Sequence, residues 1–545
     1  MTIRRVAFNC FFQDAWKVTP HFSLTYGLRY EVNSRVEEGE RRTSTFRTVN
    51  AEGKSVPPWE LGARQIMILN PQPPYGLDLR GWGPRVMAEW QAASHTVLRA
   101  GGGITTLLPP LGIENVLTGV FPFIVSPFLS ALPGSPVPFA NSLTTLQLPA
   151  VYSTSGQLAF PSGRTNDVAP NTELDVPRFQ KDLVALTPGH RAQPLSVYGM
   201  APVIPNGYIE SYTASLEQTI KDVTVSVSYV ATEGVKLASM ISPNSYTGAS
   251  PQFARFTQFD SSGQVVGGYG PEYLIGTPSH STYHALQASA SKNSARLGLG
   301  FQSSYTLGKS LDDTSSIVFS FTGPAGTVIQ TLPQDPWNPG ADKGPSTFDI
   351  SQAFSMSIIQ MLPLARSATL RPLGRKLLDG WQILNITTLT TGSPFTVYSG
   401  VQQTGAGSAG ADRPDQIAVP HFSTNRSVRE DYFGQGTNNG AFFSIPINIP
   451  GGTGPSQGRF GTLGRNTFRG PNFSNLDLAL IKDTPFGSRA GSELATLQFR
   501  AEFFNAFNLV NFGLPVNILR ASGFGLINRT AGTSRQIQFS LKLIY

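Results

Sequence analysis

The sequence predicts an all-β fold, an antiparallel β-barrel that crosses a membrane, and three observations support this prediction. The last stretch, 535–545, alternates apolar and polar residues over the length that a tilted strand needs to cross a bilayer. Charged residues make up only 14% of the chain, against about 25% in ordinary soluble domains. The hydrophobic share is nevertheless a moderate 40%, as expected when one face of every strand is polar.

The C-terminal stretch shows the pattern most clearly. Its apolar side carries Ile537, Phe539, Leu541, Leu543 and Tyr545, and only Ile544 breaks the alternation. Successive residues of a strand point to opposite faces, so this stretch has one apolar and one polar face. A soluble sandwich would also fit the alternation. The position at the end of the chain and the terminal aromatic residue favour a membrane strand.

The same alternation recurs along the chain and predicts about thirteen strands. They fall at 8–16, 22–30, 86–90, 96–103, 212–216, 223–229, 286–290, 297–305, 354–358, 381–391, 476–480, 495–503 and 537–545. Short turns, such as 17–21, alternate with long connections along the chain. The connection after 103 has roughly one hundred residues, whereas loops of compact domains seldom exceed ~15 residues. Barrels with short periplasmic turns and long extracellular loops have this organisation.

Aromatic residues sort to the two ends of the predicted strands when Tyr545 is placed at the periplasmic rim. The antiparallel order then places Trp16, Trp90 and Trp381 at periplasmic ends, and Tyr30, Tyr212, Tyr229, Tyr305 and Phe503 at extracellular ends. Amphipathic rings favour membrane–water interfaces, so we expect these residues to form two aromatic girdles.

Five charged residues share the inward parity of their strands: Arg29, Glu31, Arg99, Arg500 and Glu502. An inward charge avoids the cost of exposure to lipid. We therefore expect a salt-bridged inner wall, with contact to a plug or a passing substrate as the alternative for these lumen-facing residues.

Several signals for other functions are weak. The glycine motif 405–410 is followed by Asp412, Arg413 and Pro414 with no helical period, so we interpret it as a loop. Gly308-Lys309-Ser310 resembles the end of a phosphate loop, but the position of that motif's first glycine holds Ser303, in a predicted strand. His280 and His284 are four residues apart in loop and strand, where they do not converge on one ion. We therefore expect no catalytic residue, no cofactor and no metal site. The scattered basic residues behind the net charge of +7 do not favour nucleic-acid binding.

One long stretch, 115–163, has no charged residue, and its part 116–132 is strongly apolar. Pro122, Pro127 and Pro133 argue against a membrane helix there. We expect an extracellular loop that packs on itself or folds over the barrel mouth, where it could contact substrate.

Several blocks of sequence resemble one family from end to end of the chain. They are FFQDAWKVTPHFSLTYGLRYE (11–31), GPRVMAEW (83–90), TVLRAGGGI (96–104), YHALQASASK (283–292), SSYTLGKSLDD (303–313), GWQILNITTLTTGSPFTV (380–397), GRNTFRGPNFSNLDLALIKD (464–483) and RAEFFNAFNLVNFGLP (500–515). Their order and number resemble the barrel domain of TonB-dependent outer-membrane transporters, most closely the Oar-like branch.

This resemblance implies a barrel of about twenty-two strands with a plug domain inside it, in the outer membrane of a Gram-negative bacterium. An odd count of thirteen strands and the lack of a recognisable signal peptide fit a fragment. We therefore expect residues 1–545 to be the C-terminal part of the barrel, without plug, signal peptide or carboxypeptidase-regulatory-like domain. The implied function is energised uptake or export of a large, unidentified solute.

The resemblance also implies three partners. These are outer-membrane lipid, the barrel-assembly machinery reached through the C-terminal strand, and a TonB-type coupling protein reached only through the missing plug. Two alternatives stay open. One is a structural or adhesive surface protein with binding loops and no transport. The other is a soluble β-rich glycan-binding or hydrolytic enzyme, for which we find no pair of carboxylates that the sequence places together.

Overall fold

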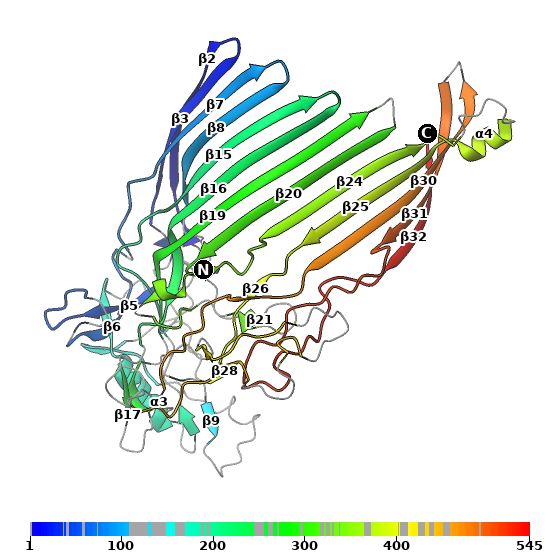
Figure 1. Ribbon diagram of the computed structural model, residues 1–545. Coiled ribbons are helices and arrows are strands. Elements are labelled where there is room, and N and C mark those ends of the chain that lie inside the picture. Colours follow the sequence, from blue (N-terminus) through cyan, green and yellow to red (C-terminus); the bar gives the residue numbers. More distant parts are fainter. Residues whose placement is uncertain are drawn as a thin grey trace.

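The structure is a computed structural model that describes most of the chain. The described residues are 3–35, 37–39, 43–56, 60, 62–73, 75–107, 122, 129–131, 149–158, 169–186, 190–192, 197–244, 256–259, 265–269, 272–294, 298–316, 321–322, 328–329, 332–336, 338–364, 372–401, 403, 412–422, 431–434, 441–450, 458–489 and 492–545. Figure 1 shows one large, curved sheet of long tilted strands, with most of the connecting segments gathered at one of its ends.

Thirteen antiparallel strands form the main path of this sheet, which we call the wall. In order across the sheet they are β2 (Ala7–Thr19), β3 (Phe22–Asn33), β7 (Trp82–Ala93), β8 (Thr96–Leu107), β15 (Gly207–Ile220), β16 (Val223–Ile241), β19 (Glu272–Ser294), β20 (Leu299–Asp312), β24 (Gln352–Leu362), β25 (Trp381–Thr390), β30 (Phe473–Arg489), β31 (Ser492–Phe504) and β32 (Gln536–Ile544). The predicted count of about thirteen strands and the antiparallel all-β fold are confirmed. Two short strands, β14 (Val197–Met200) and β23 (Gly344–Pro345), add to the sheet at β19 and β20.

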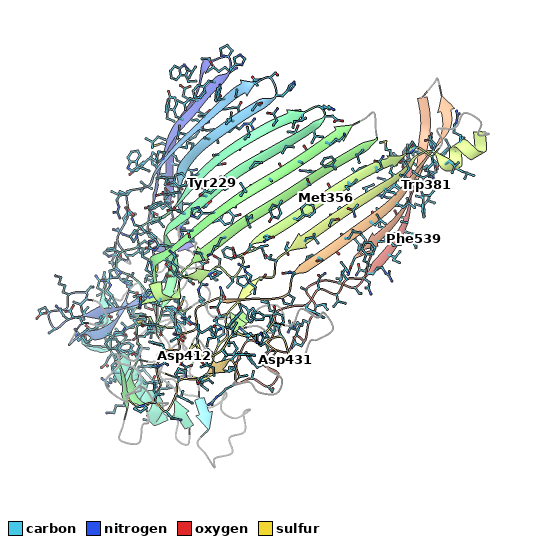
Figure 2. All side chains as sticks on the ribbon, in the orientation of Figure 1. Tyr229, Met356, Trp381, Asp412, Asp431 and Phe539 are labelled. Atoms are coloured by element: carbon cyan, nitrogen blue, oxygen red, sulfur yellow. The ribbon has the colours of Figure 1, made fainter. Side chains whose placement is uncertain are left out.

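The register aligns the apolar residues of neighbouring strands. Leu216 lies opposite Leu98 on one side and Val227 on the other, and Val227 lies opposite Ala288. The same columns continue to the last strand, where Phe539 lies opposite Ala501. We call this side of the wall the apolar face. Its large side chains are exposed, with Phe539 at 66%, rather than buried between two sheets (Figure 2).

Adjacent strands are joined by short turns at one end of the wall and by long connections at the other. The turn between β15 and β16 contains only Lys221 and Asp222, and Lys221 has a φ of 58°. A positive φ at the first central residue matches the tight hairpin turns whose twist suits the flanking strands. The short helix α4 (Pro372–Leu378) joins β24 to β25 at this short-turn end (Figure 1). Among the described residues, none of the helices has the length and apolarity that a transmembrane helix requires.

The long connections, which the sequence predicts as loops, contain ordered structure of their own. A five-stranded sheet pairs β11 (Gly156–Gln157), β10 (Tyr152–Ser153), β12 (Thr172–Leu174), β6 (Arg64–Leu69) and β5 (Ser44–Val49) in that order. Helix α3 (Val176–Leu186) packs on it through Phe179 and Leu183, which join Phe46, Met67 and Leu69 in one buried cluster. The loop prediction was therefore too simple, because these segments bury an apolar core of their own.

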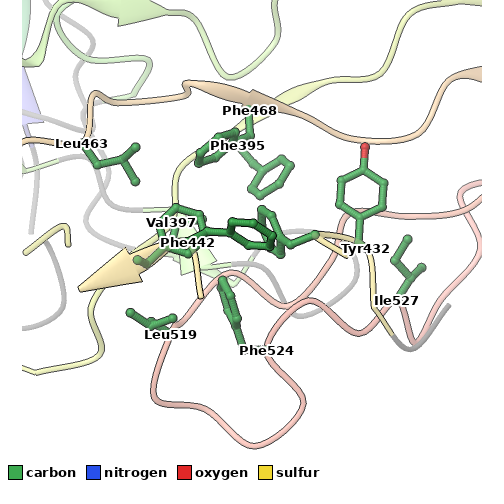
Figure 3. Packing of buried hydrophobic residues seen from close by; sticks show 11 residues of the cluster. Phe395, Val397, Tyr432, Phe442, Leu463, Phe468, Leu519, Phe524 and Ile527 are labelled. Atoms are coloured by element: carbon green, nitrogen blue, oxygen red, sulfur yellow. The ribbon is translucent and has the colours of Figure 1, made fainter. Parts of the chain in front are cut away.

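A second buried cluster joins the connection after β25 to the connection after β31. Its members are Phe395, Val397, Tyr432, Phe433, Phe442, Phe443, Leu463, Phe468, Leu519, Phe524 and Ile527 (Figure 3). Phe433 is central: its ring stacks on Phe524 with centroids 4.9 Å apart, and it meets Phe443 edge to face at 5.5 Å. We call the two clusters and the segments that carry them the loop layer.

Three ion pairs with buried carboxylates hold the connections against one another and against the end of the wall. Arg413 contacts Asp342 with 2.6 Å between Nη2 and Oδ1. Arg465 pairs with Asp312 at the end of β20, and Arg469 pairs with Asp349 just before β24. These contacts join residues more than seventy positions apart in the sequence, so they fix how the connections fold over the loop end of the wall.

The remaining short elements lie in the connections. They are the pairs β1 (Ile3–Arg4) with β4 (Glu37–Glu38), β9 (Leu129–Ala131) with β13 (His190–Ala192), β17 (Thr257–Phe259) with β18 (Val265–Gly268), β21 (Phe321–Thr322) with β22 (Val328–Ile329), β26 (Pro394–Phe395) with β29 (Phe468–Arg469), β27 (Asp415–Gln416) with β28 (Phe443–Ser444), and the 3₁₀ helix η4 (Pro339–Asp342).

Candidate functional site

The candidate site is the face of the wall opposite the apolar columns, which we call the polar face. On β8 its most prominent charge is Arg99, which lies directly opposite Glu89 of β7. The Arg99 guanidinium is 2.7 Å from Glu89 and 3.2 Å from Glu217 of β15. Three strands thus share one charge network.

The other four predicted lumen-facing residues form looser pairs. Arg29 is 3.4 Å from Glu31 on the same strand and donates a hydrogen bond of 3.0 Å to Asn9 Oδ1 on β2. Arg500 and Glu502 are 3.7 Å apart on β31. The five residues therefore lie in three separate groups along the wall, and each group contains at least one ion pair. A direct role for any of them in binding stays a prediction.

A hollow of about 610 Å³ lies on the polar face over β3, β7, β8, β15 and β16. The glycine run Gly101–Gly103 forms its floor. A Cβ on Gly101 would lie 2.5 Å from the Val86 carbonyl oxygen, and one on Gly102 would lie 2.8 Å from the Ser211 carbonyl oxygen. Glycine is therefore required here because neighbouring backbones approach too closely for any side chain.

The lining of the hollow combines apolar side chains, such as Met87 and Val230, with hydroxyl and amide groups. It includes Gln13, Thr25, Thr105, Ser211, Thr213 and Thr232. Arg85 of β7 lines this hollow and also a smaller cavity of about 210 Å³ beside Phe11 and Arg29. The arrangement offers several hydrogen-bonding groups and one cation to a solute that lies against the wall.

The predicted periplasmic girdle residues lie at the short-turn end of the wall. Trp16 and Trp90 come three residues before the ends of β2 and β7, Trp381 begins β25, and Tyr545 follows β32. Figure 2 shows Trp381 beside α4 at this end. Its indole Nε1 donates a hydrogen bond of 2.9 Å to the Leu377 carbonyl oxygen.

The predicted extracellular tyrosines lie further from the short turns but not all at the far ends of their strands. Tyr30 and Tyr212 are each eight residues from the short-turn end of their strands, whereas Tyr229 and Tyr305 are six residues from it. Eight residues of a strand tilted by about 40° rise roughly 20 Å, somewhat less than the ~25 Å height of a membrane barrel's apolar band. The strands continue beyond these tyrosines into the loop layer.

Each of these tyrosine hydroxyls has a polar partner. Tyr30 donates to the Leu79 carbonyl oxygen at 3.0 Å, Tyr305 donates to Gln352 Oε1 at 3.3 Å, and Tyr229 lies 2.8 Å from His284 Nδ1. Tyr212 donates to Glu210. An aromatic ring with a satisfied hydroxyl suits a boundary between lipid and water, and the assignment of two girdles stays a prediction.

The weaker sequence signals occupy strands or lie outside the described residues. Gly308–Ser310 lies within β20, which continues beyond the predicted strand end at 305. His280 and His284 both lie within β19, so the expectation of a loop at one of them was wrong. The glycine motif 405–410 lies outside the described residues, as does most of the uncharged stretch 115–163. Within the described ranges, no three His, Cys, Asp or Glu side chains gather closely enough to hold a metal ion.

Sequence reasoning missed the hollow, Arg85 and the aromatic core of the loop layer. The run Gly101-Gly102-Gly103 inside a predicted strand was an available signal, because glycine in a strand interior often marks a close backbone approach. The paired aromatics Tyr432-Phe433 and Phe442-Phe443 were another, since they interrupt segments that otherwise read as flexible loops.

Burial also shapes the electrostatics of the loop layer. Burial raises the pKa of Tyr432 to about 12, and its hydroxyl donates a hydrogen bond of 2.7 Å to the Arg469 carbonyl oxygen. Asp415 behaves differently. Desolvation raises its pKa, but hydrogen bonds from Arg459 and Thr462 outweigh this and leave the pKa below its ordinary value.

Comparisons with known proteins give one family and several similar structures. A family model for an outer membrane beta barrel domain matches residues 1–538. The outer membrane transporter YddB from Escherichia coli is similar over 99% of this chain and 55% of that chain, with 10% identity and a TM-score of 0.40.

The FrpB iron transporter from Neisseria meningitidis is similar over 98% of this chain and 45% of that chain, with 9% identity and a TM-score of 0.40. The siderophore receptor PirA from Acinetobacter baumannii is similar over 99% of this chain and 54% of that chain, with 8% identity and a TM-score of 0.39. This chain thus spans about half the length of these structures. No curated protein sequence matches it.

Proposed function

Because this chain belongs to the outer membrane beta barrel domain family, we propose that it forms part of a barrel that passes a large solute across the outer membrane. Its apolar face meets the lipid of a Gram-negative outer membrane, and its polar face lines the lumen. The observation that carries the proposal is this two-faced wall, with exposed Leu, Val and Phe columns on one side and paired charges around a hollow on the other.

We propose further that the wall is one part of a larger ring. An antiparallel ring needs an even number of strands, and the main path of the described strands has thirteen, with β2 at one edge and β32 at the other. These two edge strands run in the same direction, so they cannot pair with each other antiparallel. An odd number of strands from outside this path would close the ring, and a plug within that ring would make the transport TonB-dependent.

The experiment compares solute uptake by the native bacterium with uptake by a strain from which the gene is deleted. Mass spectrometry of the growth medium measures which solutes each strain removes, with and without a protonophore. We expect at least one large solute to be removed only by the parent strain and only when the membrane is energised. Identical removal by both strains would refute transport.

A second candidate, a surface adhesin with binding loops, is supported by a different observation. The loop layer packs around two buried apolar clusters of its own, and a packed layer of this kind can present a rigid binding surface outside the membrane. An adhesin predicts that the deletion strain takes up all solutes normally but attaches less well to surfaces or cells. Attachment measured on the same two strains separates the candidates.

A further inference from the structure

The guanidinium of Arg85 stands apart from the other charges of this part of the polar face. Arg85 forms no hydrogen bond or ion pair within the part of the chain that the structure describes. The register explains why. Arg85 lies opposite Gly27 of β3 on one side and Gly103 of β8 on the other, so neither neighbouring strand offers it a side chain.

Arg99 provides a contrast on the next strand of the same face. Its cross-strand neighbour is Glu89, and Glu217 approaches from the other side, so two carboxylates neutralise it. Arg29, which is also close, contacts Glu31 and Asn9. The wall therefore supplies anionic partners to two arginines and leaves the third, Arg85, facing open space.

That open space is bounded by polar groups in one cross-strand row. The row runs from Gln13 through Gly27, Arg85, Gly103 and Ser211 to Thr232. Adjacent strands lie about 4.8 Å apart, so Gln13 and Ser211 are each roughly 10 Å from Arg85 across a glycine. A solute group placed over either glycine would reach the guanidinium and a hydroxyl or amide at once.

We propose that Arg85 and this hollow form a luminal binding site for an oxyanion group, a carboxylate or a phosphate, carried by a polyhydroxylated solute. The planar guanidinium matches either oxyanion with two parallel hydrogen bonds. The hydroxyl and amide groups of Gln13, Thr25, Thr213 and Thr232 suit the hydroxyls of the same solute. The proposal rests on the transport function, for which it names the chemical class of the solute.

The test measures binding to the protein as it is assembled in the outer membrane, extracted and purified in detergent, by isothermal titration calorimetry. The probes are galactose, galacturonate and galactose 6-phosphate, which share one ring and differ in the oxyanion. We expect the wild-type chain to prefer at least one of the charged sugars over galactose by about fivefold, the effect of one ion pair on an open surface. A larger preference for one of them identifies carboxylate or phosphate as the natural group.

Two variants and one matched control decide the role of Arg85. Arg85→Gln is expected to abolish the preference. Thr25→Glu, diagonal to Arg85 on β3, is expected to abolish it with Arg85 still present, because the new carboxylate would occupy the guanidinium. Lys542→Gln removes a charge from the same face far away on β32, at a residue outside the candidate site, and should leave the preference intact. Circular dichroism of each variant confirms folding.

Equal affinity for all three sugars in the wild type, or an unchanged preference in both folded variants, would overturn the proposal. Because binding is measured without a membrane gradient, it is independent of uptake. A chain that shows the preference while the deletion strain takes up all solutes normally would refute transport and keep the site. Solute uptake that depends on the gene, in a protein that shows no preference for the charged sugars, would support transport and refute the binding site.

Discussion

The wall and the loop layer use the same kinds of side chain in opposite ways. Phe539 of the wall is 66% exposed, whereas Phe433 of the loop layer is fully buried among other rings. In water the first arrangement would be unfavourable, since each exposed aromatic ring keeps its apolar surface hydrated. In a bilayer it is favourable, because lipid takes the place that protein occupies around Phe433. The difference shows that the apolar face of the wall is suited to lipid, whereas the loop layer is suited to water.

The two regions also treat charge differently. Arg99 and its two glutamates on the wall are more than a third exposed, so water screens their attraction. The Arg465–Asp312 and Arg413–Asp342 pairs of the loop layer are almost fully buried. A buried pair stabilises its neighbours only while both partners remain, because removal of one leaves an uncompensated charge. We therefore expect the polar face of the wall to tolerate changes of charge that the loop layer does not.

The largest expected effect comes from Phe433→Ala in the loop layer. Removal of a fully buried ring should lower the free energy of unfolding of this layer by about 4 kcal/mol. Hydrogen exchange, followed by mass spectrometry, would show faster exchange in segments 395–401 and 515–527 and no change in the wall. Ile417→Ala, at an exposed position of the same layer, is the control. Equal protection in both variants would contradict a packed core.

The next effect tests which solvent surrounds the wall. Leu286 and Gln287 are adjacent exposed residues of β19 on opposite faces. Leu286→Arg would place a charge in lipid and should cost about 3 kcal/mol, whereas Gln287→Arg would place it in the lumen and should cost close to nothing. Urea unfolding of the chain inserted in lipid vesicles measures both. If the two variants were equally stable, the lipid-facing assignment of the apolar face would be wrong.

A smaller effect is expected at the ion pairs of the polar face. Arg99→Gln should lower the free energy of unfolding by about 0.5–1 kcal/mol, because the network is partly exposed and screened. The difference between wild type and variant should shrink in 1 M salt, where the Debye length is about 3 Å. The same urea titration at two salt concentrations measures this. A loss that is several times larger and independent of salt would mean that the network is buried in the assembled protein.

The smallest effect is a dependence of the loop layer on pH through Asp415. Its pKa is lowered in the folded protein, so its contribution to stability is present above the pKa of about 3.9 of an unfolded aspartate. That contribution is lost as the pH falls further, through the folded pKa, because the protonated carboxyl no longer attracts Arg459. Proteolysis of the layer by an acid protease between about pH 4 and 2 should accelerate more in the wild type than in Asp415→Asn. If proteolysis accelerated equally in both proteins, Asp415 would not be the source of the pH dependence.

Periodicity let the sequence predict the wall but not the loop layer. Alternation at 22–30 or 537–545 depends on residues two positions apart, so it can be recognised from short stretches of sequence. It predicts where the strands lie, which face each residue occupies and roughly how many strands there are. The five charged candidates were found in the same way, by parity. The partners of Arg99 were not, because they depend on which residues of β7 and β15 the register brings opposite β8.

By itself, then, the sequence determined that this protein has two-faced strands with lipid on one side and water on the other, because a period of two is written into neighbouring residues. Only the tertiary structure decided that Gly27 and Gly103 flank Arg85, and that Phe433 and Arg465 are buried by segments distant in the chain. These contacts join residues tens to more than a hundred positions apart. No local pattern encodes them, because they form only when the strands have aligned and the connections have packed.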